Sequence, residues 1–238
     1  MHRFSRTEML LGSDSLQDIN KKRVMVIGIG GVGSHAAEAL ARTGVGHLTI
    51  MDHDVVAITN INRQIHALDN TIGQPKVKVM KERILQINPK AEVVALQEFY
   101  SIEKDVQIVN TSYDYIIDAV DNVSAKIDII HRCIANNIPI ISSMGAGNRL
   151  NPLTLTIADI SETRGCPLAR VVRKELRNLG ITRGVPVVFS PDIPIEPKFE
   201  SKEPPPPGKN KIPGSVSFVP AVAGFYLAYY VIQSFLKS

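Results

Sequence analysis

The stretch "VMVIGIGGVGSHAAEAL" (residues 24–40) decides the fold class of this chain. An apolar run typical of a buried strand breaks into clustered glycines, and an alanine-rich helical pattern follows. Gly28, Gly30 and Gly33 have the spacing G-x-G-x-x-G, and Gly31 adds a fourth glycine. Glycines permit a tight turn and let backbone N–H groups approach a phosphate without a Cβ in the way. We therefore expect a nucleotide at this turn, although the spacing does not choose between NAD and ATP.

Strand-like and helix-like patterns alternate on both sides of this turn. Buried strands are predicted at residues 23–29, 47–52, 91–96, 113–120 and 138–143, with helices at 32–42, 75–87 and 124–136. This alternation predicts an α/β, Rossmann-like fold with a doubly wound, mainly parallel sheet. Such a sheet binds its ligands at the carboxyl ends of the strands.

The pattern changes toward the C-terminus. We assign residues 1–160, including N-terminal helices within 1–21, to a nucleotide-binding domain, and 161–238 to a C-terminal α+β extension of the same structural unit. Strands are predicted at 153–159 and 185–190, a basic amphipathic helix at 167–181, a proline-rich loop at 191–214 and an apolar helix at 215–236.

Composition favours a cytoplasmic globular protein. With 238 residues the chain can bury a core, and a net charge of +4 by itself favours a solvated surface over polyanion binding. Cys133 and Cys166 form no metal-ligand pattern, and so few cysteines fit a reducing compartment. The N-terminus does not resemble a signal peptide. The helix at 215–236 is long enough to span a membrane, but Pro220, Gly224 and its tyrosines favour packing in a core or a dimer.

Polar residues gather where the predicted strands end, so they can meet the glycine turn. They are Asp52 and Asp54 at the second strand, Asn60, Asn62, Arg63 and Gln64 just after it, Lys76 at a helix start, and Asp118 and Asp121 after the fourth strand. Each has a structural alternative when taken singly, such as a helix cap for Asp121 or a solvated charge for Arg63. Together they favour an enzyme that splits ATP, because a triphosphate and its metal need several cationic and acidic groups.

These residues resemble the adenylating, ubiquitin-activating-enzyme-like proteins of the ThiF/MoeB/HesA type. The matching stretches include "RFSRTEMLLG" (3–12), "TNINRQIHAL" (59–68), "YDYIIDAVDNVSAK" (113–126) and "SSMGAG" (142–147), in the family's order. Within the family the sequence is most similar to the tRNA threonylcarbamoyladenosine dehydratases. The combination of R-x-x-R with N-x-N-R-Q-I-H-A-L is specific, and the likeness is looser from Cys166 onward.

The resemblance implies an ATP site and names its residues. The nucleotide-binding set is Gly28, Gly30, Gly31, Gly33, Asp52, Asp54, Asn60, Asn62, Gln64, Lys76, Asp118 and Asp121. The resemblance places Asp52 at the ribose and Asp121 at Mg²⁺, and it assigns Asn60, Arg63, Gln64 and Lys76 to the phosphates. The catalytic set is Arg63, Lys76, Asp121 and Arg6.

The resemblance also bears on partners and metals. Arg6 matches an arginine that relatives insert into the partner subunit's site, which implies a homodimer. Zinc is not expected, because the two C-x-x-C pairs of the sulfur-carrier-activating relatives are absent. A monovalent cation and a sulfur-transfer or sulfur-acceptor partner protein stay open.

The implied activity is the ATP-dependent, cyclising dehydration of threonylcarbamoyladenosine at position 37 of tRNA, through an acyl-adenylate with release of AMP and pyrophosphate. Nucleophile and electrophile belong to one substituent, so no nucleophilic side chain is needed. One alternative is adenylation of the C-terminus of a sulfur-carrier or ubiquitin-like protein. A second is a non-catalytic nucleotide-binding module, which would not need Arg63, Lys76 and Asp121 together.

A tRNA substrate calls for phosphate contacts outside the nucleotide pocket, because an anticodon stem-loop is a polyanion larger than that pocket. The predicted helix at 167–181 carries the candidate residues Arg170, Arg173, Lys174 and Arg177, and the proline-rich loop adds Lys198, Lys202, Lys209 and Lys211. A solvated helix face is the alternative, since nearby glutamates dilute the charge.

Overall fold

The computed structural model describes residues 1–102, 109–201 and 211–237. Its strands are β1 (Arg23–Ile27), β2 (His47–Met51), β3 (Glu92–Leu96), β4 (Tyr115–Asp118), β5 (Ile140–Ser143), β6 (Thr156–Asp159) and β7 (Pro186–Phe189). They form one sheet in the order β3-β2-β1-β4-β5-β7-β6. Neighbouring strands run parallel except β6, which is antiparallel to β7. The predicted doubly wound, mainly parallel fold is confirmed.

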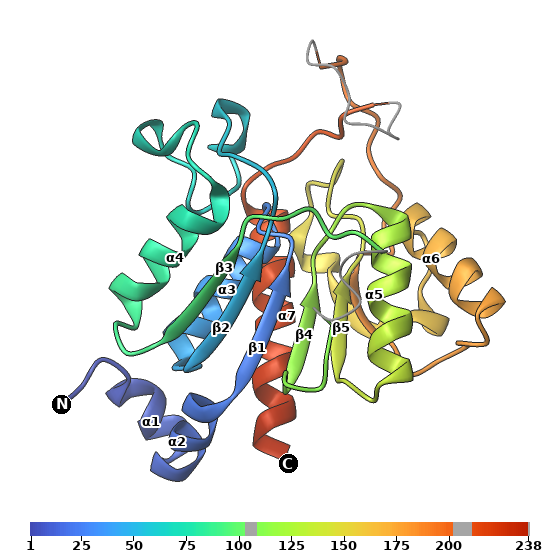
Figure 1. Cartoon of the computed structure of the whole chain (residues 1–238). Coiled ribbons are helices and arrows are strands. Elements are labelled where there is room, and N and C mark those ends of the chain that lie inside the picture. The colour runs from blue at the N-terminus through green and yellow to red at the C-terminus, as the bar shows by residue number, and fades with distance from the viewer. Residues whose placement is uncertain (103–108, 202–210, 238) are drawn as a thin grey trace.

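Helices cover both faces of this sheet (Figure 1). They are α1 (Ser5–Leu11), α2 (Ser13–Lys21), α3 (Gly33–Thr43), α4 (Lys76–Ile87), α5 (Val123–Ala135), α6 (Pro167–Asn178) and α7 (Phe218–Lys237). Successive side chains of a strand point to opposite faces. In β1, Val24 and Val26 therefore join the core under α3, α4 and α7, whereas Met25 and Ile27 join the core under α5 and α6.

Two helices differ by three residues at one end from the sequence prediction, whereas α3, α4 and α5 differ by one. Helix α6 ends at Asn178, three residues before the predicted end, and Gly180 just beyond it has a left-handed φ of +80°. Helix α7 begins at Phe218, after the predicted start at 215. Left-handed backbone is easily adopted by glycine and cannot continue a helix, which explains where α6 ends.

Helix α7 is long and apolar enough to cross a membrane by length and composition. One stripe of it, which includes Val219, Ala223 and Leu227, is buried in the core. A Cβ placed on Gly224 would lie 2.4 Å from the backbone oxygen of Val32, so only glycine permits this close approach to the start of α3. The helix therefore packs against α3 in the core of the molecule.

The strand order reverses direction at β1 and β4, which lie side by side in the sheet. In α/β sheets of this kind ligands bind at the carboxyl ends of the strands where the order reverses. Strand β7, from the proposed C-terminal extension, lies between β5 and β6. The division of the chain into a domain of residues 1–160 and an extension of residues 161–238 stays a prediction. Strands from both segments belong to one sheet.

Candidate nucleotide-binding site

The glycine turn after β1 is built on two glycines that no other residue could replace without strain. Gly28 has a φ of +90°, and a Cβ on it would lie 2.7 Å from the backbone oxygen of Ala119, at the end of β4. A Cβ on Gly33 would lie 1.8 Å from the oxygen of Gly28. A Cβ on Gly30 would meet nothing within 4 Å. The turn is thus closed by Gly28 and Gly33 and open at Gly30, where a phosphate can approach backbone N–H groups.

Carboxylates at the end of β2 link this turn to Lys76. Asp52 accepts hydrogen bonds from the backbone N–H groups of Ile29, at 2.7 Å, and Asp54, at 2.9 Å. Asp54 in turn pairs with the Lys76 ammonium at 2.6 Å. The Lys76 side chain is only 6% exposed, whereas that of Asp54 is 49% exposed. The structure therefore brings Asp52, Asp54 and Lys76 together beside the turn, as expected from the sequence.

Arg63 lies against the glycine turn. A Cβ on Gly31 would lie 3.2 Å from Cγ of Arg63, so the Arg63 side chain takes the space that a larger residue at Gly31 would need. The Arg63 guanidinium donates hydrogen bonds to the Thr59 oxygen, at 2.8 Å, and to the Asn62 side-chain oxygen, at 2.9 Å. Asn62 donates to the Ser215 oxygen at 3.0 Å, which ties this segment to the chain entering α7. Arg63 is therefore held over the turn.

The other two polar residues of this segment are buried. Asn60 accepts a hydrogen bond from the N–H of Ala57 at 3.1 Å, so its oxygen caps the short 3-10 turn Ile58–Asn60. Gln64 is also buried, and its N–H bonds to the Asn60 oxygen at 2.9 Å. The Asn60 side chain therefore has an internal structural contact, whereas the bond described for Gln64 is made by its backbone and its side-chain oxygen is buried without a hydrogen-bond partner among the described residues.

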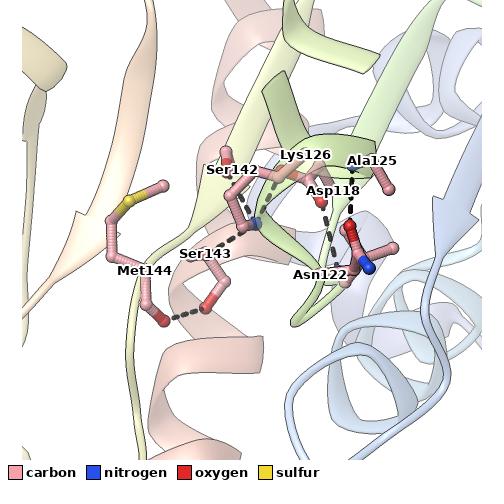
Figure 2. A network of polar contacts seen from close by, with 8 residues as sticks. Asp118, Asn122, Ala125, Lys126, Ser142, Ser143 and Met144 are labelled. Atoms are coloured by element: carbon pink, nitrogen blue, oxygen red, sulfur yellow. Dashed lines mark hydrogen bonds and ion pairs between the residues drawn. The ribbon is translucent and has the colours of Figure 1, made fainter. Parts of the chain in front are cut away.

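Asp118 lies in a buried network of polar contacts where β4 ends. Its side chain is fully buried, and one oxygen accepts bonds from the Lys126 ammonium at 2.7 Å and the Ser142 hydroxyl at 2.5 Å (Figure 2). The other oxygen accepts from the N–H of Val120 at 3.1 Å. Lys126 also donates to the Ser143 oxygen at 3.0 Å. The carboxylate is thus buried and surrounded by protein donors, and its contact with a nucleotide stays a prediction.

Lys126 is a buried charged residue at the edge of the candidate site that the sequence analysis did not single out. A signal was present: Lys126, Ile129, Ile130 and Cys133 follow helical spacing along one otherwise apolar, buried face of α5. A charged residue on such a face needs a buried partner of opposite charge. Asp118 is that partner, eight residues earlier in the chain.

Asp121 lies in the loop between β4 and α5. The cap of α5 is not Asp121 but Asn122, whose side-chain oxygen accepts a hydrogen bond from the N–H of Ala125 at 2.9 Å. Asp121 is exposed at the carboxyl edge of the sheet. The capping role that was the alternative for Asp121 is therefore filled by its neighbour.

His66 is a second residue that the sequence analysis left out. It is 1% exposed. Burial, and next the positive charge of Lys76, lowers the pKa of His66 to about 4. The imidazole is therefore neutral near pH 7, and it adds no charge to the cations beside the turn.

Arg6 is not brought to the glycine turn of its own chain. Helix α1 is fixed at the opposite end of α3, because Phe4 contacts Gly44 and the Arg3 guanidinium donates to the Ile87 oxygen at 2.6 Å. Figure 1 shows α1 and α2 below the sheet, at the amino ends of the strands. Any contact of Arg6 with a nucleotide therefore requires a second copy of the chain.

Comparison of the sequence with known proteins identifies a family and several relatives. The sequence profile of the ThiF family matches residues 4–238. The tRNA threonylcarbamoyladenosine dehydratase of Bacillus subtilis is 46% identical over 243 residues, covering 100% of this chain and 96% of the relative. The Escherichia coli protein of that name is 40% identical over 205 residues, covering 83% and 76%.

Solved structures of the Escherichia coli relative are similar to this chain in fold. The crystal structure of the Escherichia coli dehydratase in complex with ATP has a TM-score of 0.90 and 37% identity, covering 99% of this chain and 94% of that chain. Its complex with AMP gives a TM-score of 0.89 over the same shares. The family profile matches almost the whole chain, and relatives that are 40% or more identical align with it over most of their length. This chain therefore belongs to the ThiF family.

Proposed function

We propose that this chain catalyses the ATP-dependent dehydration of threonylcarbamoyladenosine in tRNA to its cyclic form. The observation that carries the proposal is that Arg63, Lys76, Asp52 and Asp54 lie beside an open glycine turn, in a chain that aligns with named dehydratases over its whole length. A relative named molybdopterin-synthase adenylyltransferase, from Escherichia coli, is 32% identical and covers 63% of this chain. That lower similarity favours dehydration over adenylation of a sulfur-carrier protein.

The reaction has two steps. The threonyl carboxylate attacks the α-phosphate of ATP, an acyl-adenylate forms, and pyrophosphate leaves. The ureido group of the same substituent then attacks the acyl carbon, the five-membered ring closes, and AMP leaves with the carboxylate oxygen. The net result is loss of one water from the nucleoside. Ring closure is intramolecular, so positioning of the substrate suffices for this step.

The residues of the site fit a triphosphate. Lys76, through its pair with Asp54, and Arg63, beside Gly31, would supply positive charge near the open position at Gly30, where we propose that charge grows on the phosphates. Lys76 is already ordered by Asp54, so it needs little reorganisation to meet a phosphate. Asp121 would hold Mg²⁺, which would neutralise phosphate charge. Asp52 would accept hydrogen bonds from the ribose.

A homodimer is part of the proposal. Arg6 is exposed and lies far from the turn of its own chain, so it would act in the partner's site. Met9 and Leu10, on the same short helix, are 84% and 87% exposed, which suits a surface that a second copy covers. The cytoplasmic location, the monovalent cation and the sulfur-transfer partner stay predictions.

The test is mass spectrometry of nucleosides after incubation of the protein with ATP, Mg²⁺ and tRNA bearing threonylcarbamoyladenosine. We expect loss of one water from that nucleoside, with AMP and pyrophosphate formed in equal amounts. Reactions without ATP, or with Lys76→Ala protein, should leave the nucleoside unchanged. Pyrophosphate release that needs a small carrier protein and not tRNA would overturn the proposal in favour of the adenylation alternative.

A further inference from the structure

A basic groove runs along α6, away from the nucleotide site. It has a volume of about 790 Å³, and among the described residues that line it are five basic side chains and no acidic one. The polar lining is Arg164, Arg170, Arg173, Lys174, Arg177 and Asn178. We call this feature the α6 groove.

The helix presents these charges on one face because its other face is fixed in the core. Ala169, Val172 and Leu176 are buried against the sheet. Arg170, Lys174 and Arg177 follow the spacing i, i+4, i+7 and are exposed. At 1.5 Å per residue, this stripe spans about 10 Å along the helix. It is therefore a fixed row of cations and not a flexible tail.

The stripe is not neutralised by the described part of the chain. Ion pairs between described residues involve Glu8, Glu38, Asp54, Asp118 and other acids, and none of them includes Arg164, Arg170, Lys174 or Arg177. Glu162 and Glu175 lie nearby in sequence, and Glu175 accepts a hydrogen bond from Asn178 at 3.2 Å. Arg173 donates to the Thr163 oxygen at 2.6 Å, so its guanidinium is held in place. The positive charge of the groove is therefore not paired within the described part of the chain.

The N-terminal end of α6 lies at the edge of the sheet that holds the nucleotide site. A Cβ on Gly145, in the loop leaving β5, would lie 3.7 Å from the Cys166 sulfur. A Cβ on Gly165 would lie 1.8 Å from the oxygen of Pro191, just after β7. Three strand spacings separate β1 from β7, which is about 14 Å. Stacked nucleotides rise about 3.4 Å each, so about four of them cover that distance.

We propose that the α6 groove binds the phosphate backbone of RNA, next to the nucleotide that enters the ATP site. This inference rests on the proposed function. Guanidinium and ammonium groups in a row meet phosphates through charge-assisted hydrogen bonds, and they supply affinity without reading sequence. The row starts at the reacting edge of the sheet, so an anticodon stem-loop bound there can extend one nucleotide toward Gly30. Lys202 and Lys209, which the sequence analysis added to this surface, lie outside the described residues, and Lys211 pairs with Glu200.

The test compares two double charge reversals in the full-length protein. Arg170→Glu/Lys174→Glu alters the α6 groove, and Lys21→Glu/Lys90→Glu alters exposed lysines that precede β1 and β3 at the opposite edge of the sheet. Both variants lower the net charge by four units, so nonspecific attraction is matched. Fluorescence anisotropy measures the binding of an unmodified anticodon stem-loop hairpin over a range of KCl concentrations.

We expect the groove variant to bind the hairpin at least about tenfold more weakly at low salt. Its plot of log affinity against log salt should flatten by about 0.7 to 0.9 for each phosphate that the variant no longer neutralises. The control variant should bind as the wild type does, and the KM for ATP should be unchanged in both. The proposal would be refuted if the groove variant bound the hairpin as tightly as the wild type does, or if both variants lost the same affinity. The α6 groove would then be a candidate site for an acidic protein partner instead.

Binding to an unmodified hairpin also keeps this inference separate from the proposed function. A protein that binds the hairpin through the groove but does not dehydrate modified tRNA would refute the reaction alone. A protein that dehydrates tRNA while the groove variant keeps the wild-type KM for tRNA would refute the groove alone.

Discussion

The Lys126 ammonium lies 2.7 Å from the carboxylate of Asp118, and neither side chain is reached by solvent. Burial of two charges costs several kcal/mol per ion, and it is tolerated only where hydrogen bonds satisfy both groups. Here the Ser142 hydroxyl, the Ser143 oxygen and the Val120 N–H complete the set. The pair joins α5 to the ends of β4 and β5, and it therefore fixes the loop that carries Asp121.

The first prediction separates stability from positioning at this pair. Lys126→Met leaves Asp118 charged and unpaired, so the free energy of unfolding should fall by about 3–5 kcal/mol. The double variant Lys126→Met/Asp118→Asn should recover most of that loss, because no buried charge remains. Its kcat should still be reduced at least about tenfold, with little change in the KM for ATP. Urea unfolding measures the stability of each variant, and dehydration kinetics measure its kcat. A wild-type kcat in the double variant would show that the Lys126–Asp118 pair has a purely structural role.

The second prediction concerns the cations beside the glycine turn. Lys76→Ala and Arg63→Ala should each lower the rate of dehydration about a hundredfold or more, because each removes a charge-assisted contact to a growing anion. Lys78→Ala, two residues along α4 and exposed, serves as the matched control and should keep its activity. Near-normal rates in both site variants would show that Lys76 and Arg63 have no role in the reaction.

The third prediction contrasts two neighbouring residues. Asp121→Asn should abolish the Mg²⁺-dependent activity while the melting temperature stays near that of the wild type, because Asn122 caps α5. Asn122→Ala should cost about 1 kcal/mol of stability through loss of that cap. Thermal unfolding together with Mg²⁺ titration of the rate measures both effects. A loss of stability in Asp121→Asn without loss of activity would reverse the assignment.

The fourth prediction tests whether Arg6 acts across a dimer. Arg6→Ala and Lys76→Ala proteins should each be inactive alone. Mixed and allowed to exchange subunits in equal amounts, they should recover about a quarter of wild-type activity, because half the dimers are hybrids with one intact site of two. Size-exclusion chromatography with light scattering establishes the oligomeric state. An active monomer would contradict the prediction.

The fifth prediction follows from His66. Its pKa is about 4 in the folded protein, below the ordinary value of about 6.5 that applies when the chain is unfolded. Between these values the unfolded chain binds more protons, so stability falls as the pH falls from about 6.5 toward 4, by at most about 3 kcal/mol from this group. His66→Gln should therefore show a smaller drop in melting temperature between pH 7 and pH 4.5. The exposed His131→Gln is the control, and the same drop in both variants would contradict the prediction.

The sequence by itself determined the fold class and the location of the site. Apolar runs such as 24–27 predict buried strands, because strands covered on both faces need apolar side chains on both. The glycine spacing at Gly28, Gly30 and Gly33 predicts the turn, because backbone that passes this close to Ala119 and to itself excludes a Cβ. Both features depend on local chemistry, and local chemistry can be read along the chain.

Only the tertiary structure decided which polar groups are buried in internal contacts and which are exposed. Asp118 and Asp121 lie three residues apart in one loop region and look alike in sequence, yet strand register places Asp118 opposite Ser142 and beside Lys126, inside the protein. Likewise, the insertion of β7 between β5 and β6 is a long-range pairing, and the start of α6 lies beside the residues that follow β5 and β7, at the carboxyl edge of the sheet. The partner of a buried charge and the neighbours of a strand are set by contacts between distant segments, and no local pattern specifies them.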